Sequence, residues 1–184
     1  DHVIPDVHRF RAIVKAAIPT VSEGQIVTFG IRPDRAETGY GWLELSSKLS
    51  DNFEPVAQPL SSFVEKPEAE VADVLLRGGM HLWNAGIFLF STSNILAAFE
   101  QYAPQTLAEV HNAFGAAEAD LGFTRLAAEP WSRLEDISID YAVMEHAPNL
   151  SVMPYGGYWS DLGDWQAIWR EGEADSFGVV TEGP

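Results

Sequence analysis

Apolar residues recur at helical spacing in several segments of the chain. Within 6–17 they lie three or four residues apart and predict an amphipathic helix with one apolar face: Phe10, Ile13, Val14 and Ala17. Pro19 is expected to end this helix. The segment 68–77 has the same character, and the glycine pair at 78–79 suits a helix C-cap. Further helices are expected over 92–102, 105–119, 138–146 (with Ser138 as N-cap) and 162–170.

Other apolar stretches are short and rich in β-forming residues, which is typical of strands. They cover 25–31, 38–45, 60–66, 82–90 and 150–154. The strand over 60–66 is expected to stop at Pro67, because a residue before proline is biased toward extended geometry. Loops are expected over 46–59 and 155–160. Since strands alternate with helices, the pattern favours an α/β layered sheet.

Length and composition fit a packed globular protein. The 184 residues suit a single domain, and no repeat or interdomain linker interrupts them. The 46% hydrophobic content argues against disorder. The chain has no cysteine, so disulfides and thiolate–metal sites are excluded. Any metal has to be held by oxygen or imidazole, which favours a hard cation such as Mg²⁺.

The chain is strongly acidic, with 27 acidic against 11 basic residues and a net charge of −16. A nucleic-acid backbone requires a basic face, so nucleic acid is not expected as a partner. No apolar stretch approaches the roughly 18–20 residues of a membrane span, and no signal peptide is visible. We therefore expect a cytoplasmic protein without membrane contact. Lys66 is one of three lysines, so an anion bound here has few cations to choose from.

Both ends of the chain suggest a part of a larger domain. Asp1 has the character of a functional residue, and no strand precedes it. The segment 178–184 has the character of a strand that leads onward. We expect 1–184 to be a partial domain.

Two aspartates are candidates for holding a metal. In an open α/β sheet, ligands bind where strands turn into helices, and Asp1 lies just before the first predicted helix. Asp161 follows a stretch of glycines and aromatic residues, where glycine allows close approach to a ligand. Hard cations favour carboxylates from separate segments, so Asp1 and Asp161 form the predicted pair. The alternatives are a frayed end or N-cap for Asp1, and for Asp161 a helix cap supported by Asp164.

Glu65 and Lys66 end a predicted strand immediately before Pro67. Neighbouring residues on a regular strand point to opposite faces, so both can serve one ligand only if the chain bends there. Pro67 favours such a bend. The alternative is an edge residue beside a surface lysine.

Asn84 is an amide in an otherwise apolar strand. A buried amide has to be hydrogen-bonded, so it pairs either with protein groups or with a polar ligand. The turn at Tyr40 and Gly41 either offers backbone donors to a ligand or is a bulge. The five histidines lack the spacing of a zinc-binding helix, and no nucleophile elbow or glycine-rich phosphate loop is present.

Taken together, these segments resemble the sugar-1-phosphate nucleotidyltransferases, specifically the bacterial mannose-1-phosphate guanylyltransferases. Any one motif is weakly specific, but all occur in family order and span nearly the whole chain. The matching segments are 1–4 (DHVI), 28–33 (TFGIRP) leading to 37–41 (ETGYG), 63–67 (FVEKP), 83–88 (WNAGIF), 138–145 (SIDYAVME) and 159–165 (WSDLGDW).

The resemblance implies roles for the charged residues. Asp1 and Asp161 would bind Mg²⁺ beside the reacting phosphates, and Lys66 would contact the phosphate of the sugar phosphate. Asp161 and Lys66 are thus the expected catalytic residues.

The resemblance also implies which groups bind the sugar. Glu65, Asn84 and the backbone at Tyr40 and Gly41 would hold the sugar hydroxyls. Asp140 is a further expected substrate contact, although the first turn of a helix is a favourable place for any carboxylate.

The implied fold is a Rossmann-like, mixed-sheet nucleotidyltransferase domain of the glycosyltransferase-A type, lacking its N-terminal strands. The implied reaction is in-line attack of mannose-1-phosphate on the α-phosphorus of GTP, giving GDP-mannose and pyrophosphate. No side-chain nucleophile is required, because positioning and charge neutralisation supply most of the catalysis of phosphoryl transfer.

One family feature is absent. The glycine-rich signature loop that cradles the triphosphate would lie upstream of Asp1, so guanine is implied by overall resemblance alone. We expect 1–184 by itself to be inactive. The alternatives are a thymidylyl- or uridylyltransferase acting on glucose-1-phosphate, and a non-catalytic sugar-phosphate-binding module. A homo-oligomer is compatible with the resemblance.

Overall fold

The computed structural model describes residues 1–48 and 55–181. Part of the expected loop over 46–59, and the last residues of the expected strand over 178–184, lie outside the described residues. No described helix is long and apolar enough to cross a membrane.

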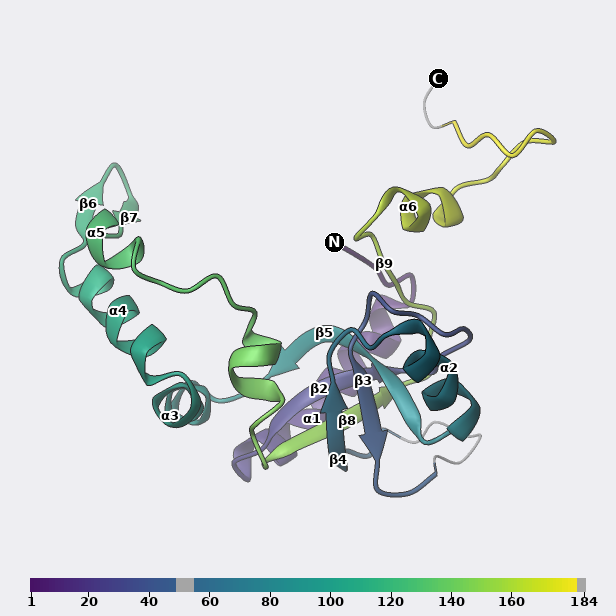
Figure 1. Ribbon diagram of the computed structural model, residues 1–184, viewed down its shortest axis with the longest axis horizontal. Helices are drawn as coiled ribbons and strands as arrows, with labels where there is room; N and C mark the ends of the chain where they lie inside the picture. The colour runs from purple at the N-terminus through teal and green to yellow at the C-terminus, as the bar shows by residue number, and fades with distance from the viewer. Residues whose placement is uncertain (49–54, 182–184) are drawn as a thin grey trace.

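Five strands form a curled sheet that closes on itself (Figure 1). Their order is β2 (Ile26–Ile31), β5 (His81–Leu89), β3 (Trp42–Leu45), β4 (Gln58–Val64) and β8 (Leu150–Tyr155). β2 and β8 run parallel, whereas the other pairs are antiparallel. Closure comes from a two-residue pairing of β4 with β8 at Gln58 and Pro59. The mixed α/β class is thus confirmed, with strands close to the expected positions.

Helix α1 (Val7–Ser22) packs one face against this sheet. Ile13 and Ala17 are buried in the cluster that contains Phe29 of β2, as their spacing predicts. The expectation that Pro19 ends the helix is wrong, because the helix continues to Ser22. Proline lacks an N–H, but its carbonyl still accepts the N–H of Glu23 at 3.1 Å, so one more turn forms.

A second core cluster joins β2 and β8 to α3 (Thr92–Tyr102) and to η1 (Asp140–Met144). η1 is a single π-helical turn where the sequence predicted a regular helix over 138–146. Ser138 still caps it in part, since its hydroxyl accepts the N–H of Tyr141 at 3.3 Å. The α2 helix (Ala69–Gly78) ends at Gly79 in the left-handed conformation, as expected.

The segment between α3 and η1 forms an arm that extends from the sheet, seen at the left of Figure 1. It contains α4 (Pro104–Gly115), the hairpin of β6 (Glu118–Asp120) and β7 (Phe123–Arg125), and α5 (Ala128–Trp131). The helix expected over 105–119 therefore ends early. The residues that follow turn into the hairpin, with positive φ at Leu121 and Gly122.

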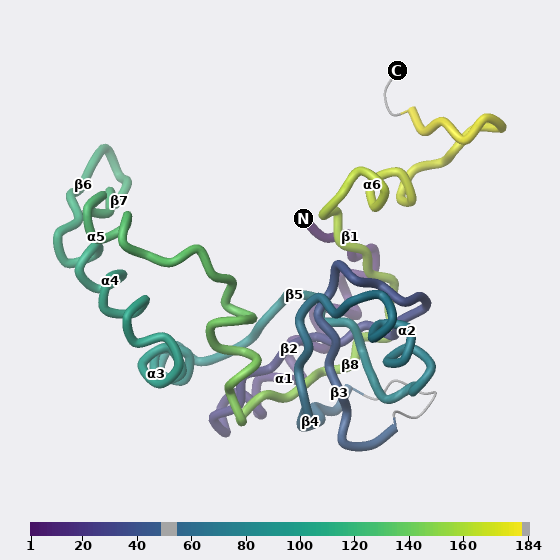
Figure 2. The backbone as a smooth tube through the Cα atoms, viewed as in Figure 1, coloured from purple at the N-terminus to yellow at the C-terminus, as the bar shows by residue number. Residues whose placement is uncertain are grey.

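The start of the chain pairs with a segment near its end. β1 (His2–Val3) and β9 (Ser160–Asp161) form a short antiparallel ladder, and Figure 2 shows these segments side by side. α6 (Trp165–Glu171) follows and begins three residues later than the helix expected over 162–170.

Candidate functional site

The chain bends sharply just after β4. The strand ends at Val64, and Lys66 has φ +45°, in the left-handed region. For a residue other than glycine, this backbone conformation costs roughly 1–2 kcal/mol. The bend brings the Lys66 ammonium within 3.5 Å of Glu65 Oε1, so the two side chains lie together as predicted. The bend expected before Pro67 is thus present, but Lys66 itself is left-handed rather than extended, as a residue before proline was expected to be.

The Glu65 carboxylate is almost enclosed, with 7% of its side chain exposed. It lies against Gly41 of the Tyr40-Gly41 turn. A Cβ atom at Gly41 would come 2.7 Å from Glu65 Oε2 and 3.2 Å from the side chain of Asn84. Any larger residue at this position would therefore force the Glu65 carboxylate to move and would crowd the side-chain base of Asn84.

Asn84 is buried on β5 and held in one orientation. Its Oδ1 accepts the N–H of Gly86 at 3.2 Å and the hydroxyl of Thr28 at 2.7 Å. A backbone N–H is only a donor, so the atom facing it has to be the oxygen. Nδ2 then faces Asp140 and donates to its Oδ1 at 3.2 Å. The amide makes protein hydrogen bonds on both sides, and its second N–H makes none with the described residues.

Asp140 joins this group from the start of η1. Burial, as the largest cause, raises its pKa, and the charge of Glu145 adds to this; the ammonium of Lys66 and the hydrogen bond from Asn84 act in the opposite direction. Burial also raises the pKa of Glu65, followed by repulsion from Asp140, while Lys66 lowers it. The cluster therefore holds more negative charge than its one ammonium compensates.

Two members of this cluster were missed from the sequence. Thr28 is fully buried on β2, and its hydroxyl in an otherwise apolar strand was the available signal. Glu145 follows η1, and its Oε1 accepts the backbone N–H of Glu65 at 3.1 Å. Glu145 ends the segment 138–145 that contributes to the family resemblance, but nothing in that segment indicates its partner, which is 80 residues away in the chain.

The side chain of Tyr40 lies in an aromatic group with Trp83 and Trp159. Its ring centroid is 5.3 Å from each of theirs. The Arg35 guanidinium lies 4.7 Å over the Trp83 ring. Burial raises the pKa of Tyr40, and the charge of Asp161 adds to this. The Tyr40 ring thus lies within the electrostatic influence of Asp161, and the next residue, Gly41, lies against Glu65.

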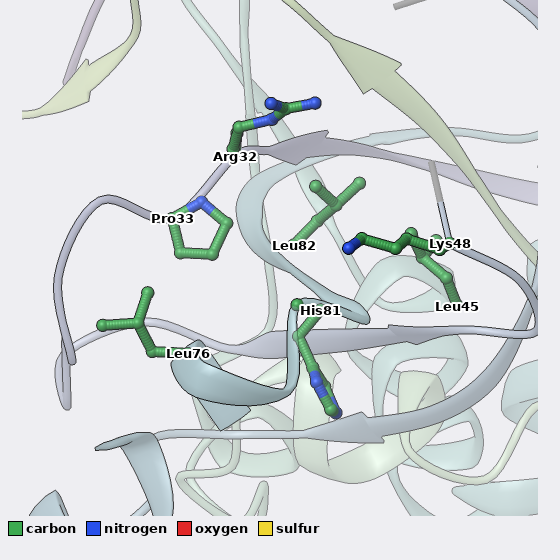
Figure 3. Close-up of a pocket in the computed structure, with 8 residues that line it drawn as sticks. Arg32, Pro33, Leu45, Lys48, Leu76, His81 and Leu82 are labelled. Atoms are coloured by element: carbon green, nitrogen blue, oxygen red, sulfur yellow. The ribbon is translucent and has the colours of Figure 1, made fainter. Parts of the chain in front are cut away.

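This aromatic group borders a cavity of about 430 Å³ between the 31–40 segment and α6. Its lining is aromatic and basic: Ile31, Arg32, Asp34, Arg35, Tyr40, Trp83, Gly157, Tyr158, Trp159, Ser160 and Arg170. Another cavity, of about 290 Å³, lies around Lys48 and His81 (Figure 3) and contains none of the predicted site residues.

The β1–β9 ladder brings the backbone at Asp1 next to the segment that carries Asp161. Asp161 pairs with His2, and the carbonyl of Asp1 accepts the N–H of Leu162 at 2.9 Å. Asp1 therefore lies opposite Leu162, one residue out of step with Asp161, and on a regular ladder its side chain would point to the other face. The register sets His2, rather than Asp1, directly opposite Asp161.

The helix-cap alternative for Asp161 is wrong. Asp164 caps α6, with its Oδ1 accepting the N–H of Ala167 at 2.6 Å. Asp161 instead accepts the N–H of Gly163 at 2.7 Å through Oδ1. The second carboxylate oxygen of Asp161 makes no hydrogen bond with the described residues.

The donor set at this ladder fits Mg²⁺ rather than a metal caged by protein. Across residues 1–48 and 55–181, no group of three or more His, Asp or Glu side chains is placed to hold an ion. Mg²⁺ is usually bound through one or two carboxylates, with water and substrate phosphates completing its shell. Asp161 offers one such carboxylate, whose second oxygen is not used in hydrogen bonds with the described residues.

Comparison with known proteins relates the chain to one family. Residues 1–176 match the family described as nucleotidyl transferase. A "Mannose-1-phosphate guanylyltransferase" of Sinorhizobium fredii (strain NGR234) is 40% identical over 183 residues, covering 100% of this chain and 35% of that protein. A protein of Escherichia coli K12 with the same description is 38% identical, covering 100% of this chain and 38% of that protein. The chain thus spans a little over a third of these relatives.

Two solved structures share the fold. A Helicobacter pylori protein described as a mannose-6-phosphate isomerase matches with a TM-score of 0.77 and 29% identity, covering 88% of this chain and 61% of that one. A Thermus thermophilus protein described as a mannose-1-phosphate geranyltransferase matches with a TM-score of 0.75 and 30% identity, covering 92% of this chain and 47% of that one.

Proposed function

Since the chain belongs to the nucleotidyl transferase family, we propose that it forms the sugar-phosphate side of an enzyme that transfers GMP from GTP to mannose-1-phosphate. The products are GDP-mannose and pyrophosphate. Mannose-1-phosphate as the acceptor rests on the relatives named mannose-1-phosphate guanylyltransferase. They are much longer than this chain, so the activity belongs to a protein that carries more than these residues.

The observation that carries the proposal is the cluster around Glu65. Residues from four separate segments converge there: Gly41, Glu65 with Lys66, Asn84 and Asp140. Carboxylates accept hydrogen bonds from hydroxyl groups, and an amide N–H donates to hydroxyl oxygen. One ammonium beside such groups suits a molecule with several hydroxyls and one phosphate.

In this proposal, Lys66 binds the phosphate of the sugar phosphate, and Glu65 and Asn84 bind its hydroxyls. Asp140 orients the Asn84 amide. The Gly41 backbone lies close to both groups, so a sugar ring placed there would contact it. These contacts hold the sugar phosphate in line with the α-phosphorus of GTP, and such positioning is a large part of catalysis in phosphoryl transfer.

Asp161 and Asp1 would hold Mg²⁺, which when bound offsets phosphate charge and orients the reacting groups. A phosphate oxygen of the sugar phosphate forms a bond to the α-phosphorus as the bond to the β-phosphate breaks, and pyrophosphate leaves. The sugar phosphate and GTP are both anionic, and the chain itself has a net charge of −16, so a cation is needed to offset the repulsion.

The test is a pyrophosphate-release assay with Mg²⁺ on a full-length protein that carries this chain. Turnover with GTP and mannose-1-phosphate, and much weaker turnover with UTP or dTTP and glucose-1-phosphate, is the expected result. The reverse preference would favour the thymidylyl- or uridylyltransferase alternative. Binding of mannose-1-phosphate without turnover would favour a binding module. Residues 1–184 alone are proposed to release no pyrophosphate.

A further inference from the structure

We infer that Glu145 is a positioning residue, which fixes the bent backbone at Glu65 and Lys66 and so places the Lys66 ammonium for the phosphate of the sugar substrate. The inference rests on the proposed function of Lys66. It adds a residue from a different segment of the chain, whose side chain acts on backbone rather than on substrate.

The bend needs an external partner. The β3–β4 ladder ends with the pairing of Val64 with Trp42, so the next N–H, that of Glu65, has left the sheet. It donates instead to Glu145 Oε1 at 3.1 Å. The following residue, Lys66, has a φ of +45° and precedes Pro67, and both conditions disfavour this backbone. The bond from Glu145 thus anchors the chain one residue before its strained position.

The π-turn explains why Glu145 reaches this N–H. The N–H of Glu145 donates to the carbonyl of Asp140 at 3.0 Å, which closes the wide turn of η1. Asp140, at the start of the turn, accepts from Asn84 on β5, and Glu145, just after the turn, accepts from Glu65 beyond β4. Through these two hydrogen bonds, η1 and the residue after it connect β5 with the bend that follows β4. π-turns of this kind occur frequently at functional sites.

Electrostatics argue against attraction of a phosphate by Glu145 itself. Its charge raises the pKa of both Glu65 and Asp140, so it adds to the negative charge around Lys66. The negative charge of Glu145 repels an anionic substrate. Its presence is best explained by the hydrogen bond that it accepts from the N–H of Glu65. An amide oxygen can accept the same bond, so glutamine is the conservative replacement.

The experiment compares Glu145→Ala, Glu145→Gln and the control Glu135→Ala in a full-length protein that carries the chain. Glu135 is an exposed acidic residue outside the cluster. Glu145→Ala should raise the KM for mannose-1-phosphate by about 10-fold, the effect of losing one hydrogen bond to a charged group, with the KM for GTP unchanged. Glu145→Gln should stay within about 2-fold of the parent protein, as should the control. Equal losses in the Ala and Gln variants would overturn the inference.

A double-mutant cycle with Lys66→Ala separates positioning from direct contact. If Glu145 acts through Lys66, the double variant should use mannose-1-phosphate no worse than Lys66→Ala alone. Losses that multiply would mean that Glu145 acts independently of Lys66 and would overturn the inference. If Lys66→Ala itself leaves the KM for mannose-1-phosphate unchanged, the proposed function of Lys66 fails instead. Thermal unfolding of each variant checks that the fold is intact.

Discussion

The side-chain amide of Asn84 donates to the carboxylate of Asp140 at 3.2 Å, although the two residues are 56 positions apart in the chain. The bond connects a buried position on β5 with the first residue of a π-turn. Because Thr28 and Gly86 both donate to the oxygen of the same amide, its orientation is fixed before any ligand binds. A preformed polar group of this kind loses little entropy when it binds a substrate.

Asn84→Asp should therefore damage both stability and sugar-phosphate use. The new carboxylate would face Asp140 without an N–H to donate, and one buried acceptor would lose its partner. We expect a loss of about 1–3 kcal/mol in the free energy of unfolding. The measurement is urea unfolding, together with calorimetric binding of mannose-1-phosphate.

Gln101→Glu is the matched control for Asn84→Asp, because it adds the same charge at an exposed position on α3. It should leave unfolding and binding unchanged. If Asn84→Asp unfolds at the same urea concentration as the parent protein, the Asn84–Asp140 bond contributes little to stability.

Glu65→Gln should make the fold more stable at neutral pH. Burial, repulsion from Asp140 and the charge of Glu145 raise the pKa of Glu65, with Lys66 lowering it in part. A carboxyl group whose pKa is raised on folding contributes stability that is fully present below its unfolded pKa, about 4.3, and is lost as the pH rises through its folded pKa. Glutamine does not titrate, so its advantage over Glu65 should grow as the pH rises from the unfolded pKa through the folded pKa, and should stay constant above it.

Thermal unfolding of both proteins between pH 4 and pH 8 measures this effect. The melting temperature of Glu65→Gln relative to the parent should rise across the interval, while its binding of mannose-1-phosphate weakens. A difference in melting temperature that does not change with pH would show that the charge of Glu65 is not costly in the folded state.

The sequence predicted the part of this site that depends on local rules. Pro67 indicated a bend that unites Glu65 and Lys66, and the isolated amide at Asn84 indicated a special position. The left-handed backbone of Lys66 was not predictable, because local preferences oppose it and a distant carboxylate, Glu145, anchors the neighbouring residue. Thr28 was overlooked because threonine is also a common strand residue.

The same limit explains the outcome for the aspartates. Spacing alone allowed Asp161 to cap the last helix with Asp164 in support, because the helix was expected to begin at 162. The pairing of β9 with β1 fixes Asp161 in a strand, and that pairing joins opposite ends of the chain. Long-range strand pairing is the kind of information that a local sequence pattern does not contain.

Lys66→Ala should chiefly weaken the use of sugar phosphate. The ammonium is the one cation of the Glu65–Asn84–Asp140 cluster among the described residues, and hydrogen bonds to charged groups contribute about 1.5–3 kcal/mol. We expect the KM for mannose-1-phosphate to rise about 10- to 100-fold, with a smaller change in the KM for GTP. The measurement is steady-state kinetics on a full-length protein that carries the chain.

Lys15→Ala serves as the control for Lys66→Ala, because Lys15 is an exposed lysine on α1. It removes the same net charge away from the cluster and should leave both KM values unchanged. Equal behaviour of the two variants would remove Lys66 from the sugar-phosphate site.

Asp161→Asn and Asp164→Ala should separate metal binding from helix capping. Asp164 caps α6 through the N–H of Ala167, so Asp164→Ala should cost about 1 kcal/mol and lower the melting temperature by about 2–4 °C. Its Mg²⁺ dependence should not change. In Asp161→Asn, the oxygen that accepts the N–H of Gly163 is retained, so the fold should keep nearly all its stability. A neutral amide is, however, a much weaker ligand for Mg²⁺ than a carboxylate, and turnover should fall by about 100-fold or more.

The Mg²⁺ titration of turnover and the melting curve have to be measured on both variants, since neither readout alone separates the two roles. The expected result is opposite in the two proteins: lost turnover with an intact fold for Asp161→Asn, and a weakened fold with normal Mg²⁺ dependence for Asp164→Ala. If Asp161→Asn lowers the melting temperature and the activity in proportion, Asp161 serves the β1–β9 ladder rather than a metal. If its turnover shows the parent protein's Mg²⁺ dependence, the metal is held elsewhere.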